Sequence, residues 1–286
     1  MSASDVPPLL RGLSEIAGRY DGVICDVWGV VHNGVEGSAP AIAALRRFRS
    51  ERGPVVLLSN APRPAIGVET QFDRLGIPRD FYDGVVTSGG AVRADLEART
   101  RDGKALKIFY LGPARDSPLL EGLNIALTDI DDADLVLCTG PFKDETEKPE
   151  DYRDMLMRFK ARRLVFLCAN PDIVVQRGDK LIYCAGALAR FYEELGGAVV
   201  YYGKPHAAVF ERALAELNTH KRIANALVIG DGLETDILGA NRMGLDVLFI
   251  GGGIHGAELR ENPDALAQLF RKLGVHAAAA MPELEW

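Results

Sequence analysis

Short apolar runs rich in β-branched residues alternate along the chain with longer segments in which apolar residues recur at helical spacing. Near the N-terminus, apolar runs at 22–28, 55–60 and 84–89 enclose helical patterns at 39–52 and 64–76. The same rhythm returns near the C-terminus, with strand patterns at 198–203, 226–231 and 246–252 and helical patterns at 207–220 and 235–244. This alternation predicts an α/β fold with a doubly wound, parallel, Rossmann-like sheet of five or six strands.

A segment of similar texture interrupts this rhythm. It holds strand patterns at 106–112, 133–140 and 164–170, a helical pattern at 152–163, and polar linkers at 98–104 and 177–186. We therefore predict a separate α/β domain at residues 92–183, inserted into a core made of residues 1–91 and 184–286. The alanine-rich end, residues 277–286, is expected to be a peripheral tail.

Composition fits a folded globular protein that is large enough to bury a site. Of the 286 residues, 48% are apolar and 26% are charged, which excludes disordered and fibrous classes. The net charge of −7 argues against a broad surface for a nucleic-acid polymer but permits a local basic pocket for a small anion. We therefore expect a small-molecule partner and no nucleic acid.

Targeting signals and cysteines both favour the cytoplasm. The apolar runs are shorter than the roughly 20 residues that span a bilayer, and residues 1–20 lack the pattern of an export signal. The cysteines show no CxxC spacing, so we expect buried free thiols at Cys25, Cys138, Cys168 and Cys184. A cytoplasmic protein that does not bind membranes is predicted, and a homodimer is compatible with the sequence.

Polar side chains stand at the ends of several predicted strands. They are Asp26, Ser59 with Asn60, Lys204, Asp231 and, five residues further at a helix start, Asp236. Because ligands of open parallel sheets bind at the carboxyl ends of the strands, we expect these residues to share one rim. Acids, a hydroxyl group and a lysine on a common rim predict a site for a cation together with an anion.

This combination of groups indicates phosphoryl transfer. Magnesium prefers carboxylate and carbonyl oxygens, so Asp26 and Asp231 can hold Mg²⁺ while it neutralises phosphate charge. Ser59 and Lys204 would bind the remaining phosphate oxygens. A carboxylate next to a bound phosphate can itself attack, forming an aspartyl-phosphate that water later hydrolyses, and we assign this role to Asp26.

Four motifs in this order resemble those of the haloacid dehalogenase superfamily: DVWGVVHNG, LLSN, GKP and GDGLETDILGA. The insertion between GVVTSGG and GKP resembles the C2 cap of subclass IIA, which holds para-nitrophenyl phosphatase-like and sugar or nucleotide phosphatase-like members. The resemblance implies that Asp26 is the nucleophile and a magnesium ligand and that Ser59 and Lys204 bind phosphate. It also implies that Asp231 is a metal ligand, with Asp236 close behind.

The residue two positions after the nucleophile departs from the family pattern. In the family, this residue binds magnesium through its backbone carbonyl, and its aspartate side chain serves as general acid and base. Trp28 keeps the carbonyl but lacks the acid, and a positioned acid typically contributes about 10²–10⁴-fold in rate, roughly 3–5 kcal/mol. Alkyl phosphates should suffer most from this loss. The indole is expected either to pack or to stack on a planar leaving group.

Two histidines are candidates for the missing proton transfer. His32 precedes Asn33-Gly34, a strong signal for a tight turn, so we expect it on a small flap beside the catalytic loop. Local hydrogen bonding is the alternative role of this imidazole. His206, just after the GKP motif, is the second candidate, and it could equally cap the following helix.

The leading hypothesis is a magnesium-dependent phosphomonoester hydrolase for a small sugar, nucleotide or aryl phosphate. Ser59, Asn60 and Lys204 would bind this substrate, and in the inserted domain Asn170 and Asp172 resemble a substrate-side loop of related proteins. An Asn-Pro-Asp turn is the alternative reading of that loop. Two other functions stay open: a phosphotransferase with a durable aspartyl-phosphate, and a protein that binds a phosphate ligand with little or no turnover.

Overall fold

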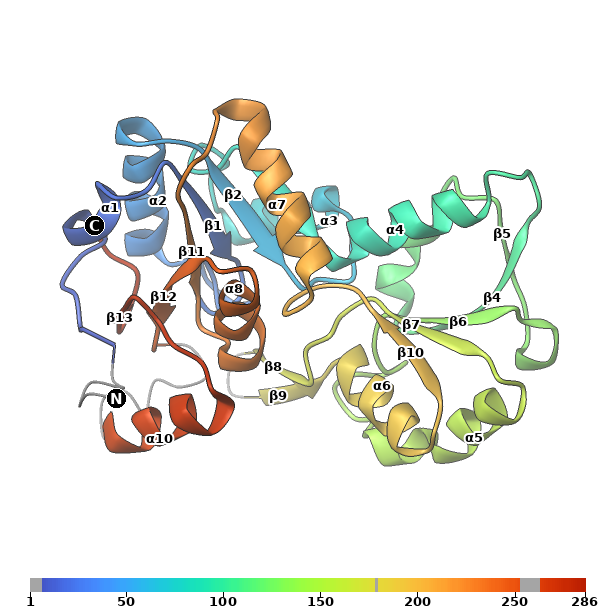
Figure 1. Cartoon of the computed structure of the whole chain (residues 1–286). Helices are drawn as coiled ribbons and strands as arrows, with labels where there is room; N and C mark the ends of the chain where they lie inside the picture. The colour runs from blue at the N-terminus through green and yellow to red at the C-terminus, as the bar shows by residue number, and fades with distance from the viewer. Residues whose placement is uncertain (1–6, 178–179, 253–262) are drawn as a thin grey trace. The chain divides into compact units, whose positions relative to one another are not determined.

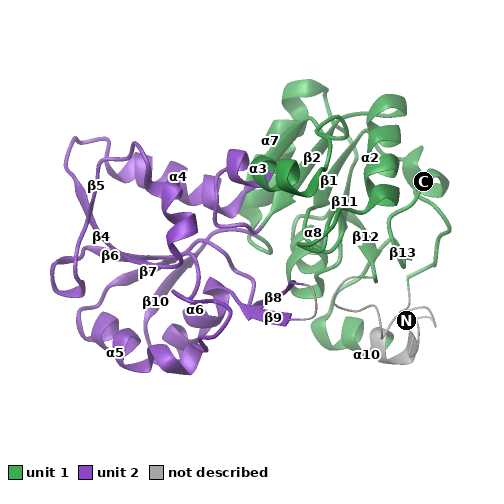
Figure 2. Ribbon diagram, turned by 180° about the vertical axis from the view of Figure 1, so that it is seen from behind, with its two compact units in different colours: residues 1–59, 69–86, 204–286 green, residues 60–68, 87–203 purple. Residues whose placement is uncertain are grey.

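The computed structural model describes residues 7–177, 180–252 and 263–286 (Figure 1). The chain divides into two compact units, which Figure 2 shows in different colours. The first unit combines the residues up to 59, residues 69–86 and the residues from 204 onwards, and the second combines residues 60–68 and 87–203. Each unit has a sheet of its own accompanied by helices. The predicted α/β class, a Rossmann-like core with an inserted α/β domain, is confirmed.

The sheet of the first unit has the strand order β13-β12-β11-β1-β2-β3. Its strands are β1 (Gly22–Asp26), β2 (Val55–Ser59), β3 (Gly84–Thr87), β11 (Ala226–Gly230), β12 (Asp246–Ile250) and β13 (Ala279–Met281). β1 runs parallel to both of its neighbours, with Ile24 opposite Val228 of β11 and Val56 of β2. All residues of β1, β2 and β11 are buried. Strands buried on both faces read as continuous apolar runs, which is the pattern that predicted them.

Helices precede or connect these strands. They are α1 (Ser14–Ala17), α2 (Ala39–Glu51), α3 (Ala65–Leu75), α7 (Ala207–His220), the π-helix η4 (Leu233–Ile237), α8 (Leu238–Arg242) and α10 (Pro263–Leu273). The N-terminus of α2 follows from local sequence: the Ser38 hydroxyl accepts a hydrogen bond from the backbone N–H of Ala41, and Pro40 occupies the first turn.

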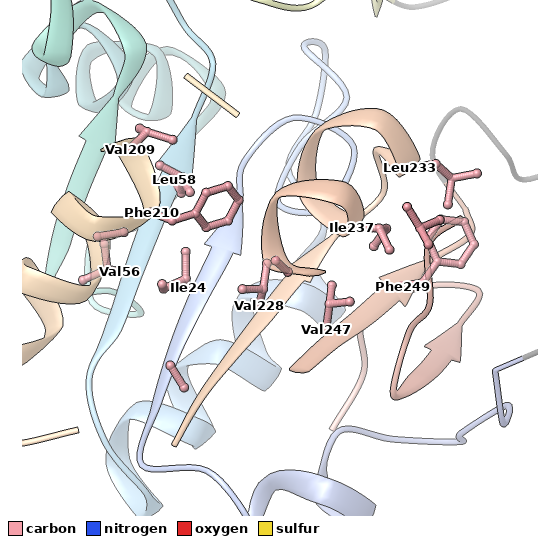
Figure 3. Close-up of a cluster of buried hydrophobic side chains, with 14 of the residues drawn as sticks. Ile24, Val56, Leu58, Val209, Phe210, Val228, Leu233, Ile237, Val247 and Phe249 are labelled. Carbon is pink, nitrogen blue, oxygen red and sulfur yellow. The ribbon is translucent and has the colours of Figure 1, made fainter. Parts of the chain in front are cut away.

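One face of the first-unit sheet packs against α7, η4 and α8 (Figure 3). Side chains alternate between the two faces of a strand, so every second residue of the central strands contributes to this core. The strand contribution is Ile24, Val56, Leu58, Val228, Val247 and Phe249. Phe210 of α7 and Ile237 of η4 are both fully buried against them. This packing fixes the strand ends that carry the polar residues.

The second unit is built on a five-stranded sheet with the order β10-β7-β6-β4-β5, in which all neighbours are parallel. Its strands are β4 (Leu106–Leu111), β5 (Ile125–Leu127), β6 (Leu135–Cys138), β7 (Val165–Cys168) and β10 (Ala198–Tyr201). β8 (Val174–Arg177) and β9 (Lys180–Tyr183) form a separate antiparallel pair. The helices are α4 (Ser88–Arg99), α5 (Arg153–Ala161), α6 (Ala185–Glu194) and the 3₁₀ turns η1 (Ala114–Leu120), η2 (Ile130–Asp132) and η3 (Pro149–Tyr152).

The boundaries of the inserted domain differ from the expected residues 92–183. The strand expected at 198–203 in the core sheet is β10, and it pairs with β7 of the second unit, so that unit extends to residue 203. The expected linker at 177–186 contains β9 and the start of α6, while its residues 178–179 lie outside the described residues. An apolar parallel strand has the same sequence pattern in either sheet, and only tertiary pairing decides which sheet it joins.

The alanine-rich end is part of the first-unit sheet, contrary to the expected peripheral tail. Residues 279–281 form β13, which pairs in parallel with β12, and all three are buried. Alanine has a low intrinsic preference for strands, so the pattern did not reveal this element. Elsewhere, the four cysteines are free and buried, as predicted. Within the described ranges, no helix has both the length and the apolar character needed to cross a membrane.

Candidate active site

Two acids lie where neighbouring strands of the first unit end. Asp26 is the last residue of β1, and Asp231 follows β11 directly. β1 and β11 are parallel, with Cys25 opposite Ile229, so their carboxyl ends adjoin at one edge of the sheet. Asp26 is 7% exposed and Asp231 6%. The two acids therefore meet at the edge where open parallel sheets bind ligands.

A buried lysine binds two acids of this edge. Lys204 Nζ donates hydrogen bonds to Asp26 Oδ1 at 2.5 Å and to Asp236 Oδ1 at 2.8 Å. Asp236 Oδ2 accepts from the backbone N–H of Gly232 at 3.2 Å and from Thr235 Oγ1 at 3.3 Å. Lys204 and Asp236 are only 2% and 1% exposed. Asp236 therefore both orders the start of η4 and faces the ammonium group.

The three acids form a possible set of metal ligands. Asp26, Asp231 and Asp236 each offer a carboxylate oxygen, and these oxygens lie within 4.8 Å of one another. Buried carboxylates need protons or cations to balance their charge, and one lysine cannot neutralise three of them. Oxygen donors in this number suit a hard divalent cation that also retains water ligands. The residues present therefore fit the expected Mg²⁺.

Burial and the neighbouring acids disfavour ionisation of Asp26, whereas the ammonium group of Lys204 favours it. Burial raises the pKa of Asp26 well above its usual range, and the nearby charge of Asp236 raises it further. The ammonium group of Lys204 lowers this pKa through its charge and its hydrogen bond. Since only the ionised carboxylate is an effective nucleophile, Lys204 promotes the reactive form.

Two glycines that sequence reasoning did not single out allow the backbone to pass close to the Asp231 and Asp236 side chains. Gly29 has a φ of +93°, and a Cβ atom added to it would lie 2.1 Å from Asp231 Oδ2. A Cβ atom added to Gly230 would lie 2.2 Å from Asp236 Cγ. Gly29 lies three residues after Asp26, and Gly230 directly precedes Asp231. A glycine this close to a motif acid is the signal that could have revealed them, because backbone there passes close to a carboxylate.

The loop after Asp26 places Trp28 and His32 against each other. Their rings meet edge to face, 5.0 Å between centroids, and the His32 ring meets Phe72 in the same way at 6.0 Å. His32 is 3% exposed, and its Nδ1 accepts a hydrogen bond from the backbone N–H of Gly34 at 3.0 Å. These contacts are those of a packing residue. The role of His32 as a general acid stays a prediction.

A tight turn is present next to the expected Asn33-Gly34 position, but its central residues are Gly34 and Val35, because the Asn33 backbone N–H donates to the Glu36 carbonyl at 3.2 Å. Asn33 Oδ1 accepts hydrogen bonds from the backbone N–H groups of Val35 and Glu36, both at 2.9 Å, and Gly34 has a φ of +88°. A Cβ atom added to Gly34 would lie 2.5 Å from the Trp28 ring. The Trp28 ring therefore packs against this turn along at least one edge, which supports the packing role.

The remaining candidates lie in three places. Ser59 ends β2 one residue beyond Leu58, which pairs with Asp26, so it belongs to the same sheet edge as Asp26. Asn60 belongs to the second unit, where its Nδ2 donates to Asp172 Oδ1 at 2.8 Å, and Asn170 Oδ1 accepts from the Asp172 backbone at 3.1 Å. His206 occupies the N-cap position of α7 without a capping hydrogen bond from its side chain.

Comparison with known proteins identifies the family. The family model for haloacid dehalogenase-like hydrolases matches residues 23–126, and a HAD-hydrolase-like model matches residues 201–273. A crystal structure of a haloacid dehalogenase-like hydrolase from Brucella suis 1330 is 42% identical, covers 96% of this chain and 99% of its own, and superposes with a TM-score of 0.85. The chain belongs to the haloacid dehalogenase-like hydrolase family.

Similar members of this family carry the names of phosphatases. The ribonucleotide monophosphatase NagD of Escherichia coli strain K12 is 28% identical over 237 residues, which are 81% of this chain and 88% of NagD. The p-nitrophenyl phosphatase of Archaeoglobus fulgidus has the same fold, with a TM-score of 0.67 at 19% identity over 92% of this chain and 96% of its own. The predicted superfamily and its subclass IIA are confirmed.

Proposed function

We propose that this hydrolase is a magnesium-dependent phosphatase that cleaves a small sugar, nucleotide or aryl phosphate through an aspartyl-phosphate on Asp26. The names of the family relatives support the phosphomonoester hydrolase class. The observation that carries the proposal is the contact of Lys204 Nζ with both Asp26 and Asp236 beside Asp231. These groups combine a nucleophile, a cation for phosphate oxygens and a set of metal ligands.

The reaction proceeds in two displacements at phosphorus. A carboxylate oxygen of Asp26 attacks phosphorus, and the bond to the leaving-group oxygen breaks; that oxygen departs as an anion and takes up a proton from water. Water then attacks the phosphorus of the aspartyl-phosphate, which releases inorganic phosphate and restores the carboxylate. Ser59 and Lys204 bind the phosphate oxygens. Mg²⁺ held by Asp26, Asp231, Asp236 and the Trp28 carbonyl would neutralise phosphate charge when bound.

The loop next to the nucleophile influences which leaving groups react well. Trp28 carries no acidic group, and His32 is buried with its Nδ1 accepting a hydrogen bond from the backbone N–H of Gly34. Leaving groups that depart without a proton, such as aryl or acyl phosphates, should therefore be cleaved faster than alkyl phosphates.

The same feature favours phosphotransfer as the second candidate function. Without an acid at position 28 to activate water, the aspartyl-phosphate should persist and pass its phosphoryl group to an alcohol. Intact-mass analysis would detect such a phosphorylated protein, and added alcohols would then speed its turnover. Rapid loss of the adduct in water alone would favour the phosphatase.

We propose that the substrate is a small molecule in the cytoplasm. The net charge of −7 supports a small-molecule substrate rather than a nucleic-acid polymer. We place the reaction in the cytoplasm and away from membranes, and the four free, buried cysteines support this setting. We also propose a homodimer. Sedimentation analysis across a range of protein concentrations would distinguish it from a monomer.

The decisive experiment is a panel of aryl, sugar and nucleotide phosphates incubated with purified protein, with Mg²⁺ or with a chelator. Phosphate release should require Mg²⁺ and should be fastest on aryl esters. The absence of release from every ester in the presence of Mg²⁺ would contradict the phosphatase. Ligand-induced thermal stabilisation without turnover would instead indicate a phosphate-binding protein.

A further inference from the structure

A polar cluster in the second unit contains Asn60 and Gly203, which adjoin Ser59 and Lys204 in the chain. We call it the Asn60 cluster, and it consists of the Asn60, Ser88 and Asp172 side chains and the backbone of Gly203. Asn60 Nδ2 donates to Asp172 Oδ1 at 2.8 Å, and Ser88 Oγ donates to Asn60 Oδ1 at 3.3 Å. Asn60 and Ser88 are buried. Both ends of the Asn60 amide are therefore used inside the protein.

The hydrogen bonds leave the amide a single orientation. A carboxylate can only accept, so the NH₂ group of Asn60 must face Asp172 and the amide oxygen must face Ser88. Asp172 is itself fixed, because its backbone N–H donates to Asn170 Oδ1 at 3.1 Å in the Asn-Pro-Asp turn. Ser88 lies in the first turn of α4, after the N-cap Thr87. The cluster thus joins three separate segments of the second unit.

The backbone of Gly203 lies directly on this cluster. A Cβ atom added to Gly203 would lie 2.1 Å from Ser88 Oγ and 2.5 Å from Asn60 Oδ1, and the φ of Gly203 is +122°. Only glycine permits this approach. Asn60 follows Ser59 by one peptide bond, and Gly203 precedes Lys204 by one. The cluster therefore fixes the backbone immediately beside both of the expected phosphate-binding residues.

We propose that Asp172 is a positioning residue for phosphate binding, acting through Asn60, and that it does not contact the leaving group. This inference rests on the proposed phosphatase function, and it replaces the substrate contact that the sequence predicts for Asn60 and Asp172. Asp172 fixes Asn60, and Asn60 with Ser88 fixes the backbone that is bonded to Ser59 and Lys204. Loss of the Asp172 carboxylate should then weaken interactions with the phosphoryl group, which is common to all substrates.

The test compares Asp172→Ala with Asp172→Asn, whose amide oxygen can still accept from Asn60. Misplacement of catalytic groups by about 1 Å can cost roughly 100-fold, so Asp172→Ala should lower kcat/KM about 10- to 100-fold, by the same factor for p-nitrophenyl phosphate, glycerol phosphate and a nucleoside monophosphate. Inhibition by inorganic phosphate should weaken in parallel. Asp172→Asn should recover activity to within about threefold of wild type, since its hydrogen bond to Asn60 is kept.

Two further variants guard against an effect on folding alone. Asp134 accepts a hydrogen bond from the Lys107 backbone in the same unit, so Asp134→Ala is the matched control and should leave kcat/KM unchanged. Ser88→Ala removes one bond of the cluster and should give a smaller loss that is again equal across substrates. A loss confined to one leaving group, or unchanged kinetics and phosphate inhibition in Asp172→Ala, would overturn the inference.

Failure of the positioning role can be distinguished from failure of the proposed phosphatase function. If the wild type releases no phosphate from any ester, the proposed function fails, and calorimetric binding of inorganic phosphate becomes the readout. Weaker phosphate binding by Asp172→Ala than by wild type and Asp134→Ala would still support the positioning role. Equal binding, or no phosphate binding by the wild type, would overturn it.

Discussion

The two sheets of this protein share an architecture but differ in what stands at the ends of their strands. In the first unit, β1 ends in Asp26, and β11 is followed by Asp231. In the second unit, the neighbouring strands β6 and β7 end in Cys138 and Cys168, which lie opposite each other. Both sheets are buried and parallel where these residues lie. The architecture alone therefore does not create a catalytic centre.

The difference lies in the charges that accompany each buried group. Burial raises the pKa of the Cys138 and Cys168 thiols, which keeps them protonated and unreactive. Burial also raises the pKa of Asp26, but Lys204 opposes this effect with a direct hydrogen bond. A buried acid becomes useful where a cation stabilises its ionised form, and that cation comes from a distant part of the chain.

The strongest test of this comparison replaces one strand-end residue in each unit. Asp26→Asn should reduce phosphate release by at least about 10⁴-fold, as expected when a covalent nucleophile is lost. Cys138→Ala should leave kcat within about twofold, because a packing residue in the second unit does no chemistry. Steady-state phosphate release measures both. A large loss of kcat in folded Cys138→Ala would contradict the division of roles.

The second test restores an acid beside the nucleophile. Trp28→Asp should increase the rate on alkyl phosphates by up to about 100-fold, with a smaller gain on aryl phosphates, because protonation helps poor leaving groups most. Trp28→Phe is the control, since it keeps an aromatic ring but supplies no acid. The ratio of kcat/KM for glycerol phosphate to that for p-nitrophenyl phosphate is the readout. An equal ratio in all three proteins would show that position 28 does not govern protonation.

The third test asks whether the acidic centre binds a divalent cation. At 100 times its dissociation constant, Mg²⁺ should stabilise the folded protein by about 2.7 kcal/mol. Asp231→Asn should lose most of this stabilisation, whereas Asp134→Asn in the second unit should retain it. Calorimetric melting with Mg²⁺ and with a chelator measures the effect. Equal Mg²⁺-induced shifts in the two variants would contradict a site at Asp231.

The smallest expected effect concerns His32. Its Nδ1 accepts from the Gly34 backbone, and the side-chain oxygen of His32→Asn can take over this bond, so kcat should stay within about threefold of wild type. Loss of the ring contacts with Trp28 and Phe72 should cost about 1 kcal/mol of folding free energy. A pH–rate profile and a denaturant titration measure both. A 100-fold fall in kcat with loss of a neutral-pH ionisation would instead identify His32 as the proton donor.

The local sequence pattern was sufficient to predict the strands and the polar residues at their ends. The runs that contain Asp26, Ser59 and Asp231 predicted parallel strands, because strands buried on both faces have continuous apolar sequences. Their ends predicted a common rim, and the structure places the Asp26 and Asp231 carboxylates together with Lys204 and Asp236. The turn that contains Asn33 and Gly34 was equally local, although it is shifted by one residue from the Asn-Gly turn that the sequence predicts.

The sequence pattern could not predict which strands pair or where side chains point. The apolar run of β10 could belong to either sheet, and alanines gave no sign of β13. Asn60 and Asp172 are far apart in sequence, and their bond at 2.8 Å turns the Asn60 amide toward Asp172.

The sequence by itself determined the class of fold, the family and the identity of the acids and the lysine, because periodicity and motif order are properties of the chain. Only the tertiary structure decided that Lys204 binds Asp26 and Asp236, that Gly29 lies against Asp231, and that His32 is buried. The physical reason is that burial and close contact depend on segments brought together by folding, and these contacts set the charge balance of the site.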